Sequence, residues 1–169
     1  PGVRENGGQY THAAIWTAMA RAMMGDTGRA WELLAMLNPI NHAADPAATA
    51  RYRVEPYVMA GDIHASPLDL GRGGWTWYTG ASGWMYRLVV ETLLGINLEG
   101  STLRFDPRVP EDWKSYEVHY RYGESVHHIT FNRIRGGPSA VSRVVLDGVE
   151  QPGRSLQLVD DGREHGVVV

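Results

Sequence analysis

The chain has 169 residues, of which 43% are hydrophobic and 21% charged, with a net charge of −3 and no cysteine. This size and composition predict a folded protein of one ordinary domain or two small ones. The slight acidity argues against a nucleic-acid binder, and the lack of cysteine excludes disulfides and thiolate metal sites. No apolar run reaches the roughly 18 residues of a membrane span, and no signal peptide is visible. Because the chain starts at Pro1 within a motif-like stretch, we expect it to be a piece of a longer protein.

Helical periodicity dominates up to about residue 98. A first helix is expected to begin with Thr11 as its N-cap and to end before Gly25 in the C′ position. A second helix follows at once, capped by Asp26 or Thr27. The link between the two helices is so short that it predicts an antiparallel helical hairpin.

A third helix is predicted over residues 80–95, where apolar residues lie on almost all sides and indicate a buried helix. The period changes to two from residue 99. We therefore expect an α+β protein with a helical domain at residues 1–98 and an antiparallel β-sandwich at residues 99–169.

The β pattern is clearest in "SYEVHYRYGE", where Tyr116, Val118, Tyr120 and Tyr122 share one face. The next strand, "SVHHITFNRI", has Val126, Ile129 and Phe131 as its apolar residues, after a tight turn at 123–124. Two further hairpins are predicted, with Asp-Gly turns at 147–148 and 161–162.

Three segments of the helical half carry candidate chemistry. The first, "RENGGQYTH", combines Arg4, Glu5 and Asn6 with two glycines and with His12 in the first turn of a helix. Its planar polar groups suit sugar hydroxyls, and His12 at a helix N-terminus suits an anion. An equally open interpretation is a loop whose polar groups only cap the helix.

The second segment, "RVEPYVMAGDIHASP", contains Glu55, Asp62 and His64. Two carboxylates could serve as the acid and base of a glycosidase. Asp62 and His64 could also bind a metal, but no third ligand stands nearby in the sequence. The simpler alternative is a turn segment in which a buried Glu55 holds backbone groups.

The third segment, "RGGWTWYTGASGWMYR", places Trp75, Trp77 and Tyr78 before Thr79 and Gly80 at the start of the third helix. Aromatic faces suit sugar rings, and the exposed N–H groups with the threonine hydroxyl suit an anion. Aromatic side chains also fill cores, so packing is the alternative role.

These segments, with "LLAMLNPINHA" between the first two, occur in an order that resembles the end of the catalytic region of glycoside hydrolase family 94, formerly glycosyltransferase family 36. The strongest likeness is to the phosphorylase-like C-terminal region of cyclic β-1,2-glucan synthases, and it covers residues 1 to about 135. The resemblance implies the last helices of an (α/α)₆ barrel followed by a jelly-roll-like β-domain. It also implies phosphorolysis of a β-linked glucan or oligosaccharide, with inorganic phosphate as co-substrate and no cofactor or metal.

Residue by residue, the resemblance implies phosphate contacts from His12, Thr79 and Gly80. It implies a sugar contact from Glu5, beside which Arg4, Trp75 and Trp77 would line the sugar site. Where cellobiose- and chitobiose-type members have a glutamine after the "EPY" motif, this chain has Gly61 or a neighbour.

The family's general acid is an aspartate in a motif that this chain lacks. Two phosphate-binding arginines of the family are also expected upstream of this chain. The resemblance therefore predicts no catalytic residue here and little turnover by the isolated chain. The alternatives left open are a non-catalytic carbohydrate-binding module and part of an inverting hydrolase. We also expect contacts with the rest of a parent chain, a possible homo-oligomer, no nucleic-acid partner, and a cytoplasmic location, possibly as part of an inner-membrane protein.

Overall fold

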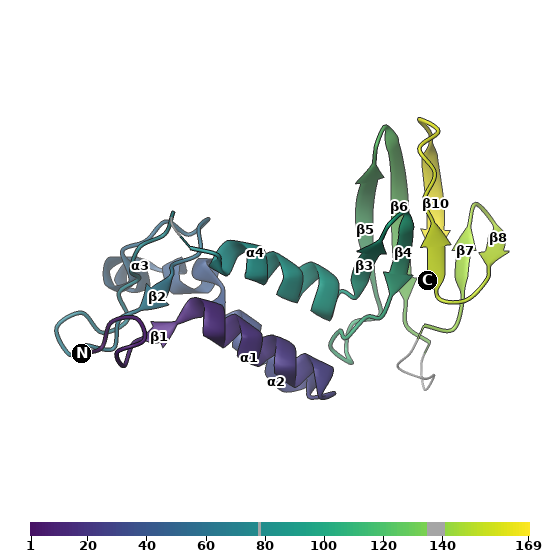
Figure 1. The fold of residues 1–169 in the computed structure, drawn as a ribbon. Helices are drawn as coiled ribbons and strands as arrows, with labels where there is room; N and C mark the ends of the chain where they lie inside the picture. The colour runs from purple at the N-terminus through teal and green to yellow at the C-terminus, as the bar shows by residue number, and fades with distance from the viewer. Residues whose placement is uncertain (78, 135–140) are drawn as a thin grey trace. The chain divides into compact units, whose positions relative to one another are not determined.

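The structure is a computed structural model that describes residues 1–77, 79–134 and 141–169 (Figure 1). The fold is α+β, and the chain divides into two compact units, Pro1–Val89 and Val90–Val169. This division precedes the change of sequence period near residue 98. The physical reason is that Val90 and Leu94, at the end of the helical segment, already pack against the core of the β unit.

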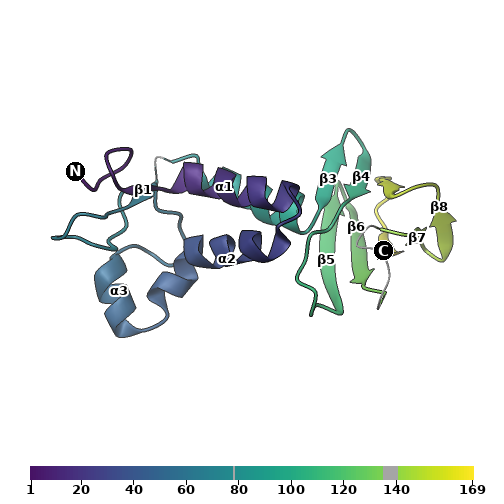
Figure 2. The same cartoon turned by 90° about the horizontal axis from the view of Figure 1, so that it is seen from below.

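The first unit is built on a hairpin of two helices, α1 (Thr11–Met23) and α2 (Thr27–Leu37). They lie side by side in both views (Figures 1 and 2). The buried side chains of α1 recur about once per helical turn, which is the spacing of a single core-facing stripe. They are Thr11, Ile15, Ala18 and Ala22.

The turn between these helices is the predicted one. Gly25 has a φ of 83°, and its N–H donates to Ala22 O at 3.0 Å while the Asp26 N–H donates to Arg21 O at 2.9 Å. This is the Schellman arrangement, which favours glycine because a Cβ is strained in the left-handed region. Asp26 then caps α2 by accepting from the Arg29 N–H.

The predicted N-cap of α1 is wrong by one position. Tyr10 is the residue before the helix and makes no side-chain cap, and Thr11 is the first helical residue. The Thr11 N–H donates instead to Gly61 O at 3.0 Å. A backbone carbonyl from a distant segment thus takes the role that sequence reasoning gave to a side chain.

The remaining elements of the first unit are short. They are strands β1 (Gln9–Tyr10) and β2 (Asp62–Ile63), the 3₁₀ helix η1 (Pro39–Ala43), α3 (Pro46–Tyr52) and α4 (Ala81–Tyr86). The π-helical η2 (Arg87–Leu93) follows α4 and includes the boundary between the two units. The expectation of an all-round buried helix at 80–95 is wrong for α4. Ala81 is buried, but Tyr86 is 59% exposed, because within the unit α4 packs by one face on α1.

The second unit consists of two sheets. Their strands are β3 (Ile96–Glu99), β4 (Thr102–Phe105), β5 (Ser115–Tyr122), β6 (Ser125–Asn132), β7 (Val144–Leu146), β8 (Val149–Gln151), β9 (Ser155–Gln157) and β10 (Glu164–Val168). One sheet has the order β5-β6-β10-β7-β8 and the other the order β3-β4-β9. Both contribute to one buried cluster, for example Leu103 and Leu156 from the small sheet with Ile129 and Val167 from the large one.

The hairpin of β5 and β6 confirms the turn predicted at 123–124. Tyr116 pairs with Phe131 and Val118 with Ile129, so the alternating apolar faces meet across the pair. Val126 does not belong to this face, since the buried positions of β6 are its odd-numbered residues.

The expectation of a wholly antiparallel β-domain is wrong. β7 and β8 form the hairpin predicted around 147–148, but the segment around 161–162 does not join two paired strands. β9 pairs with β4 in the small sheet, and β10 runs parallel to β6 with Val167 opposite Ile129. This pairing buries Val167 in the shared core. Turn motifs in the local sequence do not indicate which distant strand β10 pairs with.

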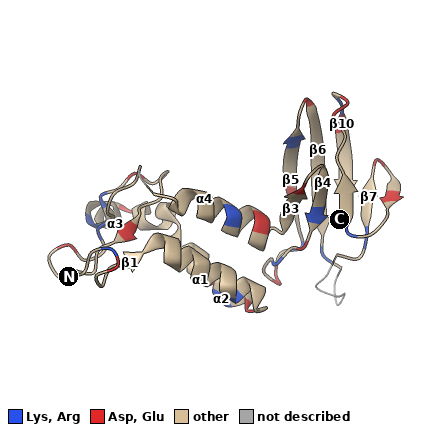
Figure 3. Cartoon of the chain, viewed as in Figure 1, with Lys and Arg blue, Asp and Glu red and all other residues tan. Residues whose placement is uncertain are grey.

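Within the described residues, no helix is both long and apolar enough to cross a lipid bilayer. Lys and Arg alternate with Asp and Glu along the chain rather than gathering in one segment (Figure 3).

Candidate functional site

The three motif segments of the first unit meet at the short strand β2. On one side β2 pairs with β1, with Tyr10 opposite Asp62. On its other side the Gly61 N–H donates to Trp75 O at 2.7 Å, and the Gly74 N–H donates to Asp62 O at 2.8 Å. Residues far apart in the sequence therefore lie side by side through backbone hydrogen bonds.

Arg4 and Trp75, both predicted to line a sugar site, are brought together. The guanidinium carbon of Arg4 lies 3.6 Å from the centroid of the Trp75 ring, a cation–π contact. Arg4 sits in a tight loop closed by the Gly2 N–H donating to Asn6 O at 2.6 Å, and it has a φ of 50°. Glu5, the next residue of this loop, is exposed.

Trp75 and Trp77, which we call the aromatic wall, are partly open to solvent. Trp77 is 74% exposed, and Trp75 is 50% exposed although the Arg4 guanidinium covers one face of its ring. Tyr78, the third aromatic residue named from the sequence, lies outside the described residues.

Two of the three residues assigned to phosphate, His12 and Gly80, lie close together, and Thr79 precedes Gly80 in the chain. His12 lies in the first turn of α1, and a Cβ built on Gly80 would be 4.0 Å from His12 Cε1. The Nε2 of His12 is buried and has no hydrogen-bond partner among the described residues. The Thr79 hydroxyl oxygen accepts from the Ala81 N–H at 3.1 Å, a bond that does not use its own O–H group.

Two tryptophans that sequence reasoning did not single out hold the His12 ring in place. The Trp16 ring lies edge-on to it with centroids 4.7 Å apart, and the Trp84 centroid is 5.5 Å away. The signal for Trp16 was present, because residues four apart on a helix are neighbours. Trp84 comes from α4, and no local pattern predicts that contact.

The second motif segment does not supply an exposed acid–base pair. Asp62 is 1% exposed, and its Oδ2 accepts from the Arg4 N–H at 2.8 Å. His64 Nε2 is 3.8 Å from the same oxygen. Among the described residues, no three His, Cys, Asp or Glu side chains are grouped so that they could hold a metal ion. Glu55 is half-buried, and its carbonyl accepts from the Val58 N–H.

Gly61, at or next to the position where some family members have a glutamine, has no room for a side chain. A Cβ there would lie 2.9 Å from Trp75 Cδ1. The ring of Trp75 therefore occupies the space that a longer residue would need.

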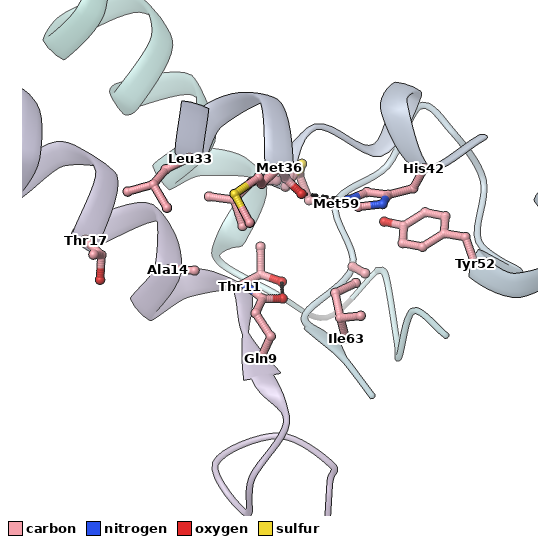
Figure 4. A pocket seen from close by; sticks show the side chains of 12 residues that line it. Gln9, Thr11, Ala14, Thr17, Leu33, Met36, His42, Tyr52, Met59 and Ile63 are labelled. Atoms are coloured by element: carbon pink, nitrogen blue, oxygen red, sulfur yellow. Dashed lines mark hydrogen bonds between the residues drawn. The ribbon is translucent and has the colours of Figure 1, made fainter. Parts of the chain in front are cut away.

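A separate cavity of about 330 Å³ lies on the other face of β1 and β2. Gln9 and Ile63 line it (Figure 4), whereas their neighbours Tyr10 and Asp62 do not, since successive side chains of a strand point to opposite faces. Burial raises the pKa of the Tyr52 hydroxyl at its edge, although the Ala60 N–H opposes that effect. The cavity is thus lined by other side chains of the first two motif segments, and none of the residues assigned to sugar or phosphate lines it.

Comparison with known proteins gives these residues a family context. The catalytic-domain profile of the Glycosyl hydrolase 94 superfamily matches residues 1–95. The chain is 48% identical over 133 residues to the cyclic beta-(1,2)-glucan synthase NdvB of Rhizobium meliloti (strain 1021), which covers 79% of this chain and 5% of that protein.

Two phosphorylases are also similar. N,N'-diacetylchitobiose phosphorylase of Vibrio furnissii is 30% identical over 149 residues, which is 87% of this chain and 18% of that enzyme. The 1,2-beta-oligoglucan phosphorylase of Listeria innocua serovar 6a (strain ATCC BAA-680 / CLIP 11262) is 29% identical over 163 residues, which is 88% of this chain and 14% of that enzyme. The chain spans less than a fifth of the length of each of these relatives.

The matched residues 1–95 contain the whole set of convergent side chains, from Arg4 to Gly80. The profile match and the relatives agree on one assignment, and the chain belongs to the Glycosyl hydrolase 94 superfamily.

Proposed function

We propose that this chain forms one wall of the active site of a glycoside phosphorylase or cyclic β-1,2-glucan synthase that acts on β-linked glucosyl substrates. In the proposed reaction a phosphate oxygen forms a bond to the anomeric carbon, and the glycosidic carbon–oxygen bond breaks. A general acid gives its proton to the leaving oxygen, and the sugar is released as α-glucose 1-phosphate. Because phosphate is already an anion, the protein must hold it in place but need not deprotonate it.

The observation that supports the proposal is the closeness of His12, with its buried and unpartnered Nε2, to Gly80. A buried imidazole nitrogen without a partner is costly unless a ligand completes its hydrogen bonding. The Thr79 hydroxyl, next to Gly80 in the chain, is a second group that could donate to the same anion. Each hydrogen bond to a charged phosphate oxygen is stronger than a neutral one.

The sugar is assigned to Arg4, Glu5, Trp75 and Trp77. The exposed indole faces match the flat apolar faces of pyranose rings, and Glu5 matches their hydroxyl groups. The burial of Asp62 argues against the hydrolase alternative in which it would act as acid or base. The exposed tryptophans would serve a non-catalytic sugar-binding module equally well.

The general acid is proposed to belong to a part of a longer polypeptide outside these 169 residues. In that polypeptide the first unit would complete an (α/α)₆ barrel. A cytoplasmic location is part of the proposal and follows from the resemblance alone. The isolated chain is expected to bind ligands weakly and to turn nothing over.

The test gives the full-length polypeptide β-1,2-glucooligosaccharide with and without inorganic phosphate. Glucose 1-phosphate that forms only when phosphate is present supports phosphorolysis. Release of reducing sugar without phosphate would favour a hydrolase, and binding without any product would favour a non-catalytic module.

A further inference from the structure

Asp62 is a buried carboxylate at the centre of the three convergent segments. With 1% of its surface exposed, it is the one carboxylate among the described residues that is fully buried. Burying a carboxylate costs free energy unless hydrogen bonds replace its water. A group kept in such a position therefore calls for an explanation.

The contacts of Asp62 explain how the sugar-binding loop keeps its shape. Its Oδ2 accepts from the Arg4 N–H at 2.8 Å, across 58 positions of sequence. Arg4 has a φ of 50°, a conformation that disfavours any residue with a Cβ. The hydrogen bond that the Arg4 N–H donates to the Asp62 carboxylate offsets that strain and fixes the loop at the residue before Glu5.

The other oxygen of Asp62 lies against the backbone of Gly74, the residue before Trp75. A Cβ added at Gly74 would overlap Asp62 Oδ1, so the glycine lets the carboxylate lie directly against the backbone beside Trp75. The Gly74 N–H also donates to the Asp62 carbonyl oxygen at 2.8 Å. One side chain thus contacts both pieces of chain whose side chains meet in the Arg4–Trp75 pair.

We propose that Asp62 is a positioning residue for sugar binding, which locks the Arg4 loop and the Trp75 wall in the geometry that receives the glycan. This inference rests on the proposed function of the site. Among the described residues, the hydrogen bond of the Asp62 side chain goes to Arg4 and its ion pair to His64, so we assign its role to the sugar rather than to phosphate.

The experiment compares Asp62→Ala and Asp62→Asn in the full-length polypeptide, with Asp69→Asn as the matched control. Asp69 lies in the same segment and pairs with Arg72 at the surface. We expect Asp62→Ala to raise KM for β-1,2-glucooligosaccharide by about tenfold or more, from the loss of a charged hydrogen bond, with KM for phosphate within about twofold. Asp62→Asn keeps one acceptor oxygen and should restore part of the loss, while Asp69→Asn should match the wild type.

A second variant approaches the same contact from the other side. Gly74→Ala should push the carboxylate away from Arg4 and reproduce the Asp62→Ala phenotype. In the double variant the two changes should be strongly non-additive, because both remove the same contact. Additive effects would overturn the inference.

Hydrogen exchange supplies a readout that does not need turnover. In peptides covering residues 2–8, Asp62→Ala should speed exchange of the Arg4 amide, and Asp69→Asn should leave it unchanged. Unchanged exchange in Asp62→Ala, or equal changes in KM for sugar and phosphate, would refute the positioning role. If the wild-type polypeptide makes no sugar phosphate at all, the proposed function itself fails and the inference falls with it.

Discussion

Replacing His12 with alanine should weaken phosphate binding far more than sugar binding. The Nε2 of His12 is buried and has no hydrogen-bond partner among the described residues. The Cε1 of the same ring would lie 4.0 Å from a Cβ built on Gly80. The ring is held between Trp16 and Trp84, so little ordering remains to be done when the anion arrives.

The size of the effect follows from the hydrogen bond that is lost. A hydrogen bond to a charged group contributes about 1.5–3 kcal/mol, which corresponds to a roughly 10- to 150-fold rise in KM for phosphate. His12→Ala removes this bond and leaves a gap beside two indole rings, so a modest loss of stability should accompany the change.

The assay measures initial rates of the full-length polypeptide at varied phosphate and saturating oligosaccharide, and then the reverse. His119→Ala is the control, because His119 is an exposed histidine of the β unit and should leave both KM values unchanged. A His12→Ala variant with normal phosphate dependence, or with equal losses for phosphate and sugar, would refute the assignment of His12 to the anion.

Two further predictions concern the β unit. Leu103→Ala should destabilise it by about 2–5 kcal/mol, because Leu103 is fully buried in the shared core; Val149→Ala, at an exposed site, should change the melting midpoint little. His165 binds Asp147 and Asp161, and hydrogen bonds to these carboxylates raise its pKa above 6.5. The carboxylates in turn have lowered pKa values, chiefly through the hydrogen bond from His165. Because the pKa of His165 is raised, its protonated form stabilises the fold below pH 6.5, and this contribution is lost as pH rises through the folded pKa. Because the pKa values of Asp147 and Asp161 are lowered, their charged forms stabilise the fold above about pH 3.8. The difference in melting temperature between wild type and His165→Asn should therefore be largest between about pH 4 and 6.5 and shrink on both sides; a difference independent of pH would contradict this.

Local elements could be predicted from sequence because their signals are local. Gly25 ends α1 through its own backbone conformation, and the alternation of Tyr116 to Tyr122 specifies a strand whatever its partner is. The parallel pairing that places Val167 opposite Ile129 could not be predicted in this way. An apolar strand has two edges, and only the packed core decides which neighbour each edge receives.

The candidate site shows the same limit in another form. The sequence motifs assigned His12, Thr79 and Gly80 to phosphate, and the structure places Gly80 close to His12, while the phosphate role stays a prediction. The sequence did not reveal what Asp62 does, because its partner Arg4 is 58 positions away in a segment without regular periodicity. Paired carboxylates suggested chemistry at Asp62, whereas its burial indicates that it holds backbone in place.

The most direct test of the central claim is a crystal structure of the full-length polypeptide soaked with phosphate. We expect density for the anion within hydrogen-bonding distance of His12 Nε2 and the Thr79 hydroxyl, with the backbone of Gly80 alongside. Phosphate bound elsewhere in the active site, with the His12 imidazole still unpartnered, would contradict it.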